Sequence, residues 1–350
     1  MSSHAPVVTG LLSYGMSGEV FHAPLLNAHP GFELRTIVQR TKNTSAARYP
    51  SIQIARSVDD VLEDSQIELV IVNTPNNTHA EYARQALKAG KHVVIEKPFT
   101  ITRREAAQLI ALARTQKKVL SVFHNRRWDG SFLTVQHVLR SGVLGKVVEF
   151  ESHYDRFRNT ITAGSWKEQV GPGTGILYNL GSHMLDQVLV LFGKPKYVTA
   201  RVGVQRPGGK ADDFYDIRLE YPGMQVIVKS SYLVREPSPI FRINGVQGSF
   251  VKYGQDPQEE ALKQGITPGS AGWGTETESW WGKLNIDMGG IPVEGKIETV
   301  PGNYQVYYDN LFDAVRKSKA LIVKPEQAMM VIQLIEAAMK SSQTRRSIKF

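Results

Sequence analysis

Apolar residues in the first 125 positions fall into short continuous runs, and segments with a helical repeat separate these runs. A continuous apolar run is typical of a strand covered on both faces, so buried strands are predicted at 7–12, 34–38, 69–73, 92–96 and 119–124. A helix predicted at 79–89 stops at Gly90, and Thr102 with Glu105 forms a capping-box sequence that opens another. This alternation predicts a parallel, doubly wound α/β domain.

The pattern changes after residue 125. Helices are predicted at 131–141 and 182–192, and residues 146–154 alternate as a half-exposed strand. Residues 196–251 read as successive strands separated by Pro-Gly and Asn-Gly turns, which predicts an antiparallel meander. Residues 255–295 give no clear prediction. Two further helices close the chain.

Two domains are therefore expected, as a length of 350 residues also suggests. Residues 1–125 form the α/β domain. Residues 126–350 form an α+β domain with a large, mostly antiparallel sheet, and the helix after Pro325 packs back on the first domain. An open apolar sheet face is usually an interface, so we expect a homodimer or homotetramer through this sheet.

Composition narrows the function. The chain has no cysteine, which excludes disulfides and thiol nucleophiles. The start of the chain lacks a signal-peptide pattern, and every apolar run is shorter than the ~20 residues of a membrane span, so a cytoplasmic protein without a membrane partner is expected. The net charge of +9 fits an anionic ligand. The basic residues are scattered, so a nucleic-acid partner is not expected.

The segment after the first predicted strand occupies the position of a Gly-x-Gly-x-x-Gly phosphate loop. It reads Ser13, Tyr14, Gly15, Met16, Ser17, Gly18, with serine in place of the first glycine. The loop predicts contact with a dinucleotide pyrophosphate, and an ordinary strand-to-helix turn is the alternative. Serine fits at position 13 if its φ is negative and strains the loop if its φ is positive.

The end of the second predicted strand favours NADP over NAD. An acidic residue usually stands there to hold the ribose 2′-hydroxyl of NAD, but the chain has Gln39-Arg40-Thr41-Lys42. Arg40 is suited to pair with a 2′-phosphate. The alternative is that Arg40 is a solvated loop residue.

Three further stretches carry candidate chemistry. The ends of the third and fourth strands, where doubly wound sheets bind ligands, carry Thr74, Pro75, Asn76 and His79, and then Glu96, Lys97 and Pro98. Downstream, Asn179 and His183 are four residues apart, which places them on one face of a helix. Each stretch alone also has a purely structural explanation.

In this order, these residues resemble the Gfo/Idh/MocA oxidoreductases over essentially the whole chain. Glu96-Lys97-Pro98 is the most specific match. Residues 123–129, 150–157 and 301–304 are most similar to the NADP-preferring scyllo-inositol dehydrogenases. The resemblance implies a Rossmann N-terminal domain, an NADP or NAD cofactor, and an inositol-like polyol or sugar as substrate.

The resemblance also implies roles for particular residues. Lys97 and His183 stand at the reacting hydroxyl, one as the base and the other as a positioning group, and the sequence does not choose between them. Cofactor contacts are expected from Ser13, Gly15, Met16, Ser17, Gly18, Arg40, Thr74, Pro75, Asn76, His79, Glu96, Lys97 and Asn125. Substrate contacts are expected from Asn179, His183, Arg126, Tyr154, Arg156 and Trp166, although Trp166 is equally suited to the core.

Two positions depart from the family pattern. Family members usually carry Asp where this chain has Asn179, which keeps a carbonyl acceptor but loses the charge. A catalytically weak or inactive NAD(P)-binding regulatory protein is therefore the alternative function. Ser13 is the milder departure. No metal site is expected, because His22, His124 and His153 lack metal-ligand spacing.

Overall fold

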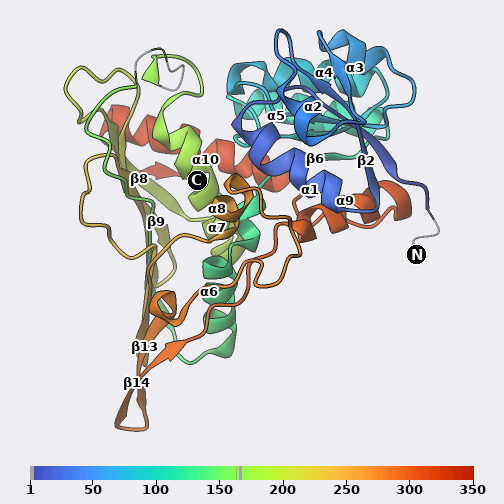
Figure 1. Ribbon diagram of the computed structural model, residues 1–350. Helices are drawn as coiled ribbons and strands as arrows, with labels where there is room; N and C mark the ends of the chain where they lie inside the picture. Colours follow the sequence, from blue (N-terminus) through green and yellow to red (C-terminus); the bar gives the residue numbers. More distant parts are fainter. Residues whose placement is uncertain (1–3, 163, 165–167) are drawn as a thin grey trace. The chain divides into compact units, whose positions relative to one another are not determined.

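The computed structural model describes residues 4–162, 164 and 168–350, and they form two compact units (Figure 1). The first unit ends at Asn125 and regains two later segments, Gln258–Trp273 and Asn303–Met329. The second comprises Arg126–Pro257, Gly274–Gly302 and Met330–Phe350. The sequence predicted a single boundary at residue 125, and it did not predict that these two later segments belong to the first unit.

The first unit is built on a six-stranded parallel sheet, as predicted. Its order is β3-β2-β1-β4-β5-β6, with bounds Gln53–Ala55, Phe32–Val38, Val7–Leu11, Leu69–Val72, His92–Ile95 and Leu120–Val122. All four residues of β4 are fully buried, as a central parallel strand requires. The order reverses between β1 and β4, so the carboxyl ends of these strands form a crevice. The edge strand β3, which has three residues, was not predicted from the sequence.

Helices connect these strands. In chain order they are η1 (Gly18–His22), α1 (Ala23–Ala28), α2 (Thr44–Arg48), α3 (Asp59–Glu63), η2 (Asn76–Thr78), α4 (His79–Lys88) and α5 (Arg103–Thr115). The predicted capping box is present at α5: the Thr102 hydroxyl accepts from the Glu105 amide, and the Glu105 carboxylate accepts from the Thr102 amide. Helices α8 (Gln258–Lys263) and α9 (Gln305–Lys317) belong to the returning segments.

The second unit has a nine-stranded sheet in the order β14-β13-β12-β11-β7-β10-β9-β8-β15. In chain order the strands are β7 (Val147–His153), β8 (Tyr197–Gly203), β9 (Phe214–Tyr221), β10 (Met224–Ser231), β11 (Phe241–Gly245), β12 (Gly248–Lys252), β13 (Gly282–Met288), β14 (Ile291–Ile297) and β15 (Ile348–Lys349). Among the described strands of this sheet, only β10 and β7 pair in parallel, so the predicted α+β class with a mostly antiparallel sheet is confirmed.

The predicted simple meander over 196–251 is wrong at one point. Strands β10 and β11 are consecutive in the chain but do not pair, because β7 lies between them. Alternation along a strand shows which side chains are buried, but it does not show which strand is the neighbour. Most of the hairpin β13–β14 falls in residues 255–295, for which no element was predicted.

The two faces of this sheet differ. One face is buried: Phe241 stacks near Phe132 of α6 (Gly130–Ser141), and Phe150 packs against Phe192 of α7 (Ser182–Phe192) at a centroid distance of 5.2 Å. The opposite face is mixed rather than uniformly apolar, because charged residues such as Arg218 and Arg242 pair there with Ile227 and Val251. The turns η3 (Asn125–Trp128), η5 (Leu177–Gly181) and η6 (Glu278–Trp280) and the long α10 (Pro325–Thr344) complete the described elements.

Candidate dinucleotide site and catalytic residues

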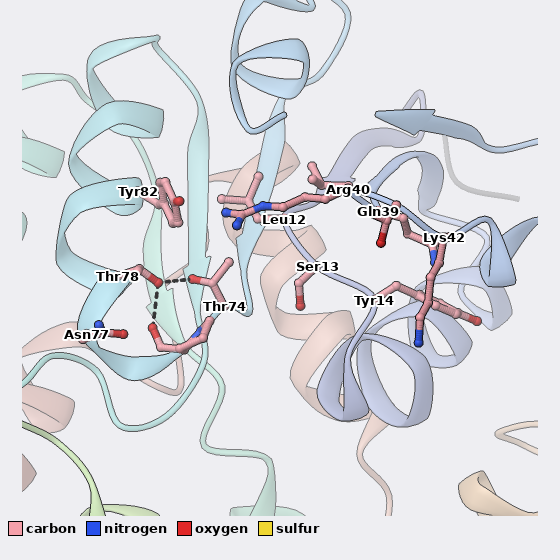
Figure 2. A pocket seen from close by; sticks show the side chains of 13 residues that line it. Leu12, Ser13, Tyr14, Gln39, Arg40, Lys42, Thr74, Asn77, Thr78 and Tyr82 are labelled. Atoms are coloured by element: carbon pink, nitrogen blue, oxygen red, sulfur yellow. Dashed lines mark hydrogen bonds between the residues drawn. The ribbon is translucent and has the colours of Figure 1, made fainter. Parts of the chain in front are cut away.

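A cavity of about 460 Å³ lies at the carboxyl ends of β1, β2 and β4 in the first unit (Figure 2). Arg40 and Lys42 are the cations in its wall, and none of the described residues that line it is acidic. The cavity therefore has the charge that a phosphate-bearing ligand needs. Its lining residues are Leu12, Ser13, Tyr14, Val38, Gln39, Arg40, Thr41, Lys42, Thr74, Pro75, Asn77, Thr78 and Tyr82.

Ser13 is fastened to the end of β4. Its amide donates to Asn73 Oδ1 at 3.0 Å, its hydroxyl donates to the Asn73 carbonyl at 2.9 Å, and its carbonyl accepts from Asn73 Nδ2 at 2.8 Å. Ser13 is not among the described non-glycine residues with positive φ, so serine fits here without strain. The Ser13 hydroxyl therefore holds the loop against the end of β4.

The two remaining loop glycines differ in their surroundings. A Cβ on Gly18 would lie 2.8 Å from Asn73 Nδ2 and would clash with the Ser13 carbonyl oxygen, so this position requires glycine. A Cβ on Gly15 would meet only the Ser13 hydroxyl, at 3.8 Å. Met16 is exposed, and it, Ser17 and both glycines lie outside the cavity lining.

Hydrogen bonds made by Gln39 and Arg56 hold the loop that follows β2. The Gln39 side chain is buried, donates to Thr44 Oγ1 at 2.9 Å and accepts from the Ser45 amide at 3.0 Å. The Arg56 guanidinium donates to the carbonyls of Gln39 and Lys42 at 2.7 and 3.0 Å. These bonds fix the backbone of a loop whose Arg40 and Lys42 side chains are exposed.

Figure 2 shows the Arg40 side chain extending across the cavity toward Thr74 and Tyr82, while Lys42 stays on the side of Tyr14. Arg40 was predicted from the sequence as a cofactor contact, whereas Lys42, Tyr14 and Tyr82 were not. The signal for Lys42 was present, since it lies two residues beyond Arg40 in a loop without a carboxylate.

The end of β4 forms the opposite wall. Thr78 Oγ1 donates to the Pro75 carbonyl at 2.7 Å and lies 2.7 Å from Thr74 Oγ1, as Figure 2 shows. Asn76 lies outside the cavity lining. His79 is buried with its ring nitrogens 2.8 Å from the Pro98 carbonyl and 2.9 Å from the Thr74 carbonyl, and this burial lowers its pKa. His79 therefore joins two strand ends and does not itself line the cavity.

Glu96 takes part in a buried chain of hydrogen bonds that also includes His22 and Tyr308. Its Oε1 lies 3.1 Å from His22 Nε2, and His22 Nδ1 lies 2.6 Å from the Tyr308 hydroxyl. Its Oε2 accepts from the Lys97 amide at 2.9 Å. Burial opposes ionisation of Glu96, but the His22 hydrogen bond and the charges of His22, Lys97 and His79 hold its pKa below the usual value. The carboxylate therefore fixes the backbone that carries Lys97.

In the second unit, Asn179 lies on the π-helical turn η5 and His183 on the first turn of α7, which continues from it. Asn179 is half-buried and His183 is 5% exposed. Asp212 holds the start of η5, because its Oδ2 accepts from the Leu177 amide at 2.8 Å. Burial raises the pKa of Asp212 to about 6. Sequence reasoning missed Asp212, which lies 33 positions beyond Asn179.

The remaining candidates are placed as follows. The Arg126 guanidinium lies 6.0 Å from the centre of the buried Tyr154 ring and donates to Asp129 at 3.3 Å. Arg156 donates its amide to the Ser231 carbonyl, and Asn125 is buried. Trp166 lies outside the described residues. Lys97 and Asn125 belong to the first unit, and the substrate candidates to the second.

The strand order, the crevice and a cation-lined cavity define a dinucleotide-binding α/β protein. Residues 7–124 match the oxidoreductase-family domain described as an NAD-binding Rossmann fold, and residues 137–350 match the C-terminal alpha/beta domain of that family. The chain belongs to the Gfo/Idh/MocA oxidoreductase family.

Relatives and solved structures agree with this assignment. The chain is 42% identical to the uncharacterized oxidoreductase YdgJ of Escherichia coli over 97% of each chain. It is 39% identical to the scyllo-inositol 2-dehydrogenase (NADP(+)) IolW of Bacillus subtilis, covering 98% of this chain and 95% of the relative. The structure of the oxidoreductase yvaA from Bacillus subtilis superposes with a TM-score of 0.96 at 37% identity over the whole of both chains. No helix in the described part of the chain is long and apolar enough to cross a bilayer.

Proposed function

We propose that the chain is a dehydrogenase that transfers hydride between NADP(H) and a hydroxyl-bearing carbon of a cyclic polyol or sugar, such as an inositol. The observation that carries the cofactor choice is the wall formed by Arg40 and Lys42 without a carboxylate. The relative named as an NADP(+)-dependent scyllo-inositol dehydrogenase supports both the cofactor and the substrate class.

The cofactor site fits on chemical grounds. Arg40 and Lys42 would hold the 2′-phosphate, and the loop from Ser13 to Gly18 would present its backbone to the pyrophosphate. Thr74 and Pro75 would form the opposite wall. The bound nicotinamide supplies or accepts the hydride.

In this proposal, a protein side chain removes the proton from the substrate hydroxyl. Lys97 and His183 are the two candidates for the base, and Asn179 binds a substrate hydroxyl through its amide. Glu96 supports Lys97 by holding its amide. Arg126, Tyr154, Arg156 and Trp166 remain the predicted substrate contacts.

A second function rests on Asn179. An amide cannot supply the negative charge that the family's usual Asp places beside His183, so a weakly active or inactive NAD(P)-binding regulatory protein is the competing proposal. The cytoplasmic location and the absence of a nucleic-acid partner stay predictions.

One experiment separates the two functions. The purified chain is incubated with NADP and a panel of inositols and sugars, and NADPH formation is followed by absorbance. Turnover with a member of the panel is the expected result. Tight NADPH binding without turnover across the panel would favour the regulatory function, and failure to bind either dinucleotide would overturn both.

A further inference from the structure

A carboxylate, an imidazole and a phenol form one continuous hydrogen-bonded chain inside the first unit. Glu96 follows β5, His22 ends η1, and Tyr308 lies on α9 in a returning segment of the chain. His22 and Tyr308 are fully buried, and Glu96 is 8% exposed. None of the three lines the dinucleotide cavity, so the Glu96 side chain, a predicted cofactor contact, is bonded within the protein interior instead.

The acidity of the two end groups fixes the direction of each hydrogen bond. Burial opposes ionisation of Glu96, but the His22 hydrogen bond and neighbouring charges hold its pKa below the usual value, so it is a carboxylate at neutral pH. Burial raises the pKa of the Tyr308 phenol well above its usual value, so the hydroxyl keeps its proton. A carboxylate only accepts, so His22 donates from Nε2 to Glu96, and its Nδ1 accepts from Tyr308.

The charge on Glu96 acts on Lys97. Glu96 Oε2 accepts from the Lys97 amide, and the positive charge of Lys97 helps to lower the pKa of Glu96. The attraction is mutual, and it is stronger in a buried setting than in water, so the carboxylate favours the protonated form of Lys97. His79 of α4 also acts on both residues, but burial lowers its pKa and favours the neutral ring.

We propose that His22 and Tyr308 are positioning residues that hold a fixed negative charge on Glu96 beside Lys97, and so set the pH at which Lys97 gains its proton. The inference rests on the proposed function, in which Lys97 is a candidate base. A base must lose its own proton before it can take one from a substrate hydroxyl, so this buried chain fixes the pH range of the reaction.

The test measures the protonation of Lys97 directly, without turnover. The protein is treated with a trace of acetic anhydride at a series of pH values, and acetylation of Lys97 is quantified by peptide mass spectrometry, since only the neutral amine reacts. Glu96→Gln keeps an acceptor for the Lys97 amide but removes the charge. The pH of half-maximal reaction is expected to fall by about one unit. An unchanged value would overturn the proposal.

Tyr308→Phe tests the far end of the chain. It removes the hydroxyl that donates to His22 Nδ1, so the carboxylate charge is held less firmly, and the half-reaction pH is expected to fall by about 0.3–0.5 units. Glu96→Gln/Tyr308→Phe is expected to match Glu96→Gln alone, because Tyr308 acts through the carboxylate. Additive shifts would show that Tyr308 acts on Lys97 by another route and would overturn the proposal.

The matched control is Tyr307→Phe. Tyr307 is the neighbouring buried tyrosine on α9, and its hydroxyl donates to Ser121 at 3.0 Å. Loss of this bond is expected to leave the half-reaction pH of Lys97 unchanged. A shift as large as that of Tyr308→Phe would make both effects structural and would contradict the proposed role. Circular dichroism and thermal melting check the fold of each variant.

The tautomer of His22 gives a second measurement that is made on the wild type. Nitrogen-15 NMR of histidine-labelled protein is expected to show a proton on Nε2 and none on Nδ1, with the His22 signals identified by their loss in His22→Gln. A proton on Nδ1 alone would overturn the proposal. Neither measurement needs turnover, so an inactive protein would count against the proposed function and not against this inference.

Discussion

The loop at residues 13–18 and the helix start at residues 177–183 each carry a departure from the family pattern, and the chain treats the two differently. At the loop, the Ser13 hydroxyl is bound to the Asn73 carbonyl, so the substituted side chain is used within the fold. At the helix start, Asn179 is half-buried on the π-helical turn, and its side chain is the group proposed to bind the substrate. Under the proposed function, the first substitution is expected to leave ligand binding nearly unchanged and the second to change the chemistry.

The largest effect is expected at Lys97, which tests the first unit's share of the chemistry. Lys97→Ala removes a candidate base, so kcat falls about 10²- to 10⁴-fold, the range for a lost general acid–base group. Steady-state kinetics measure the loss, and circular dichroism with thermal melting serves as the control, since the substitution is expected to leave the fold intact. An unchanged kcat would remove Lys97 from the mechanism.

Asp212 tests how the helix start in the second unit is held. Its folded pKa of about 6 lies above the usual carboxyl value of 3.8, so the folded state binds the proton more tightly than the unfolded state. The resulting stability is fully present below about pH 4 and is lost as the pH rises through about 6, a change of about 3 kcal/mol at 1.36 kcal/mol per unit. Asp212→Asn removes this dependence. Urea unfolding from pH 4 to pH 7 measures it, and identical pH profiles for both proteins would contradict the account.

Arg40 and Lys42 test the charge-based part of the cofactor site. Arg40→Ala/Lys42→Ala removes charge-assisted bonds to the 2′-phosphate, and because both side chains are exposed, water weakens these bonds to about 1.4–2.7 kcal/mol in total. The dissociation constant of NADPH is expected to rise about 10- to 100-fold, while that of NADH changes little. Isothermal titration calorimetry with both cofactors measures this selectivity. Equal losses for NADPH and NADH would show that the two cations do not read the 2′-phosphate.

Asn179 tests the chemical side of the comparison. Asn179→Asp restores a carboxylate beside His183, and kcat is expected to rise about tenfold, equivalent to about 1.4 kcal/mol of transition-state stabilisation. The NADPH dissociation constant is the control and is expected to stay level. A fall in kcat would show that this chain's chemistry has adapted to the amide.

The smallest effect is expected at Ser13. Ser13→Gly removes the hydroxyl bond to the Asn73 carbonyl and adds backbone freedom, so the free energy of unfolding falls by about 1 kcal/mol. NADPH affinity is expected to change by less than about twofold, because the backbone amides remain. A larger loss of affinity would mean that the hydroxyl contacts the cofactor directly.

Much of the fold could be predicted from the sequence, and the reasons differ from element to element. Strands β1, β2, β4, β5 and β6 were readable because burial on both faces leaves a continuous apolar run. Strand β3 was not, because it lies at the edge of the sheet and its residues, Gln53–Ala55, form no continuous apolar run. The position of β7 inside the second sheet was also hidden, since strand pairing is decided by tertiary packing.

The candidate site was only partly readable. Motifs that lie at strand ends, such as Glu96-Lys97-Pro98, could be found because their residues are consecutive in the sequence and directly follow a predictable strand. Lys42 could have been found from its position two residues beyond Arg40. The bonds from Arg56 to the Gln39 and Lys42 carbonyls, and the bond from the Leu177 amide to Asp212, could not be predicted, because these partners are distant along the chain.

The cation-lined cavity at the end of β2 is proposed to select the 2′-phosphorylated cofactor. Isothermal titration calorimetry of the wild type with NADPH and with NADH measures this selectivity. NADPH is expected to bind at least about tenfold more tightly, which corresponds to about 1.4 kcal/mol. Equal affinity for the two cofactors, or tighter binding of NADH, would show that the cavity does not select the 2′-phosphate.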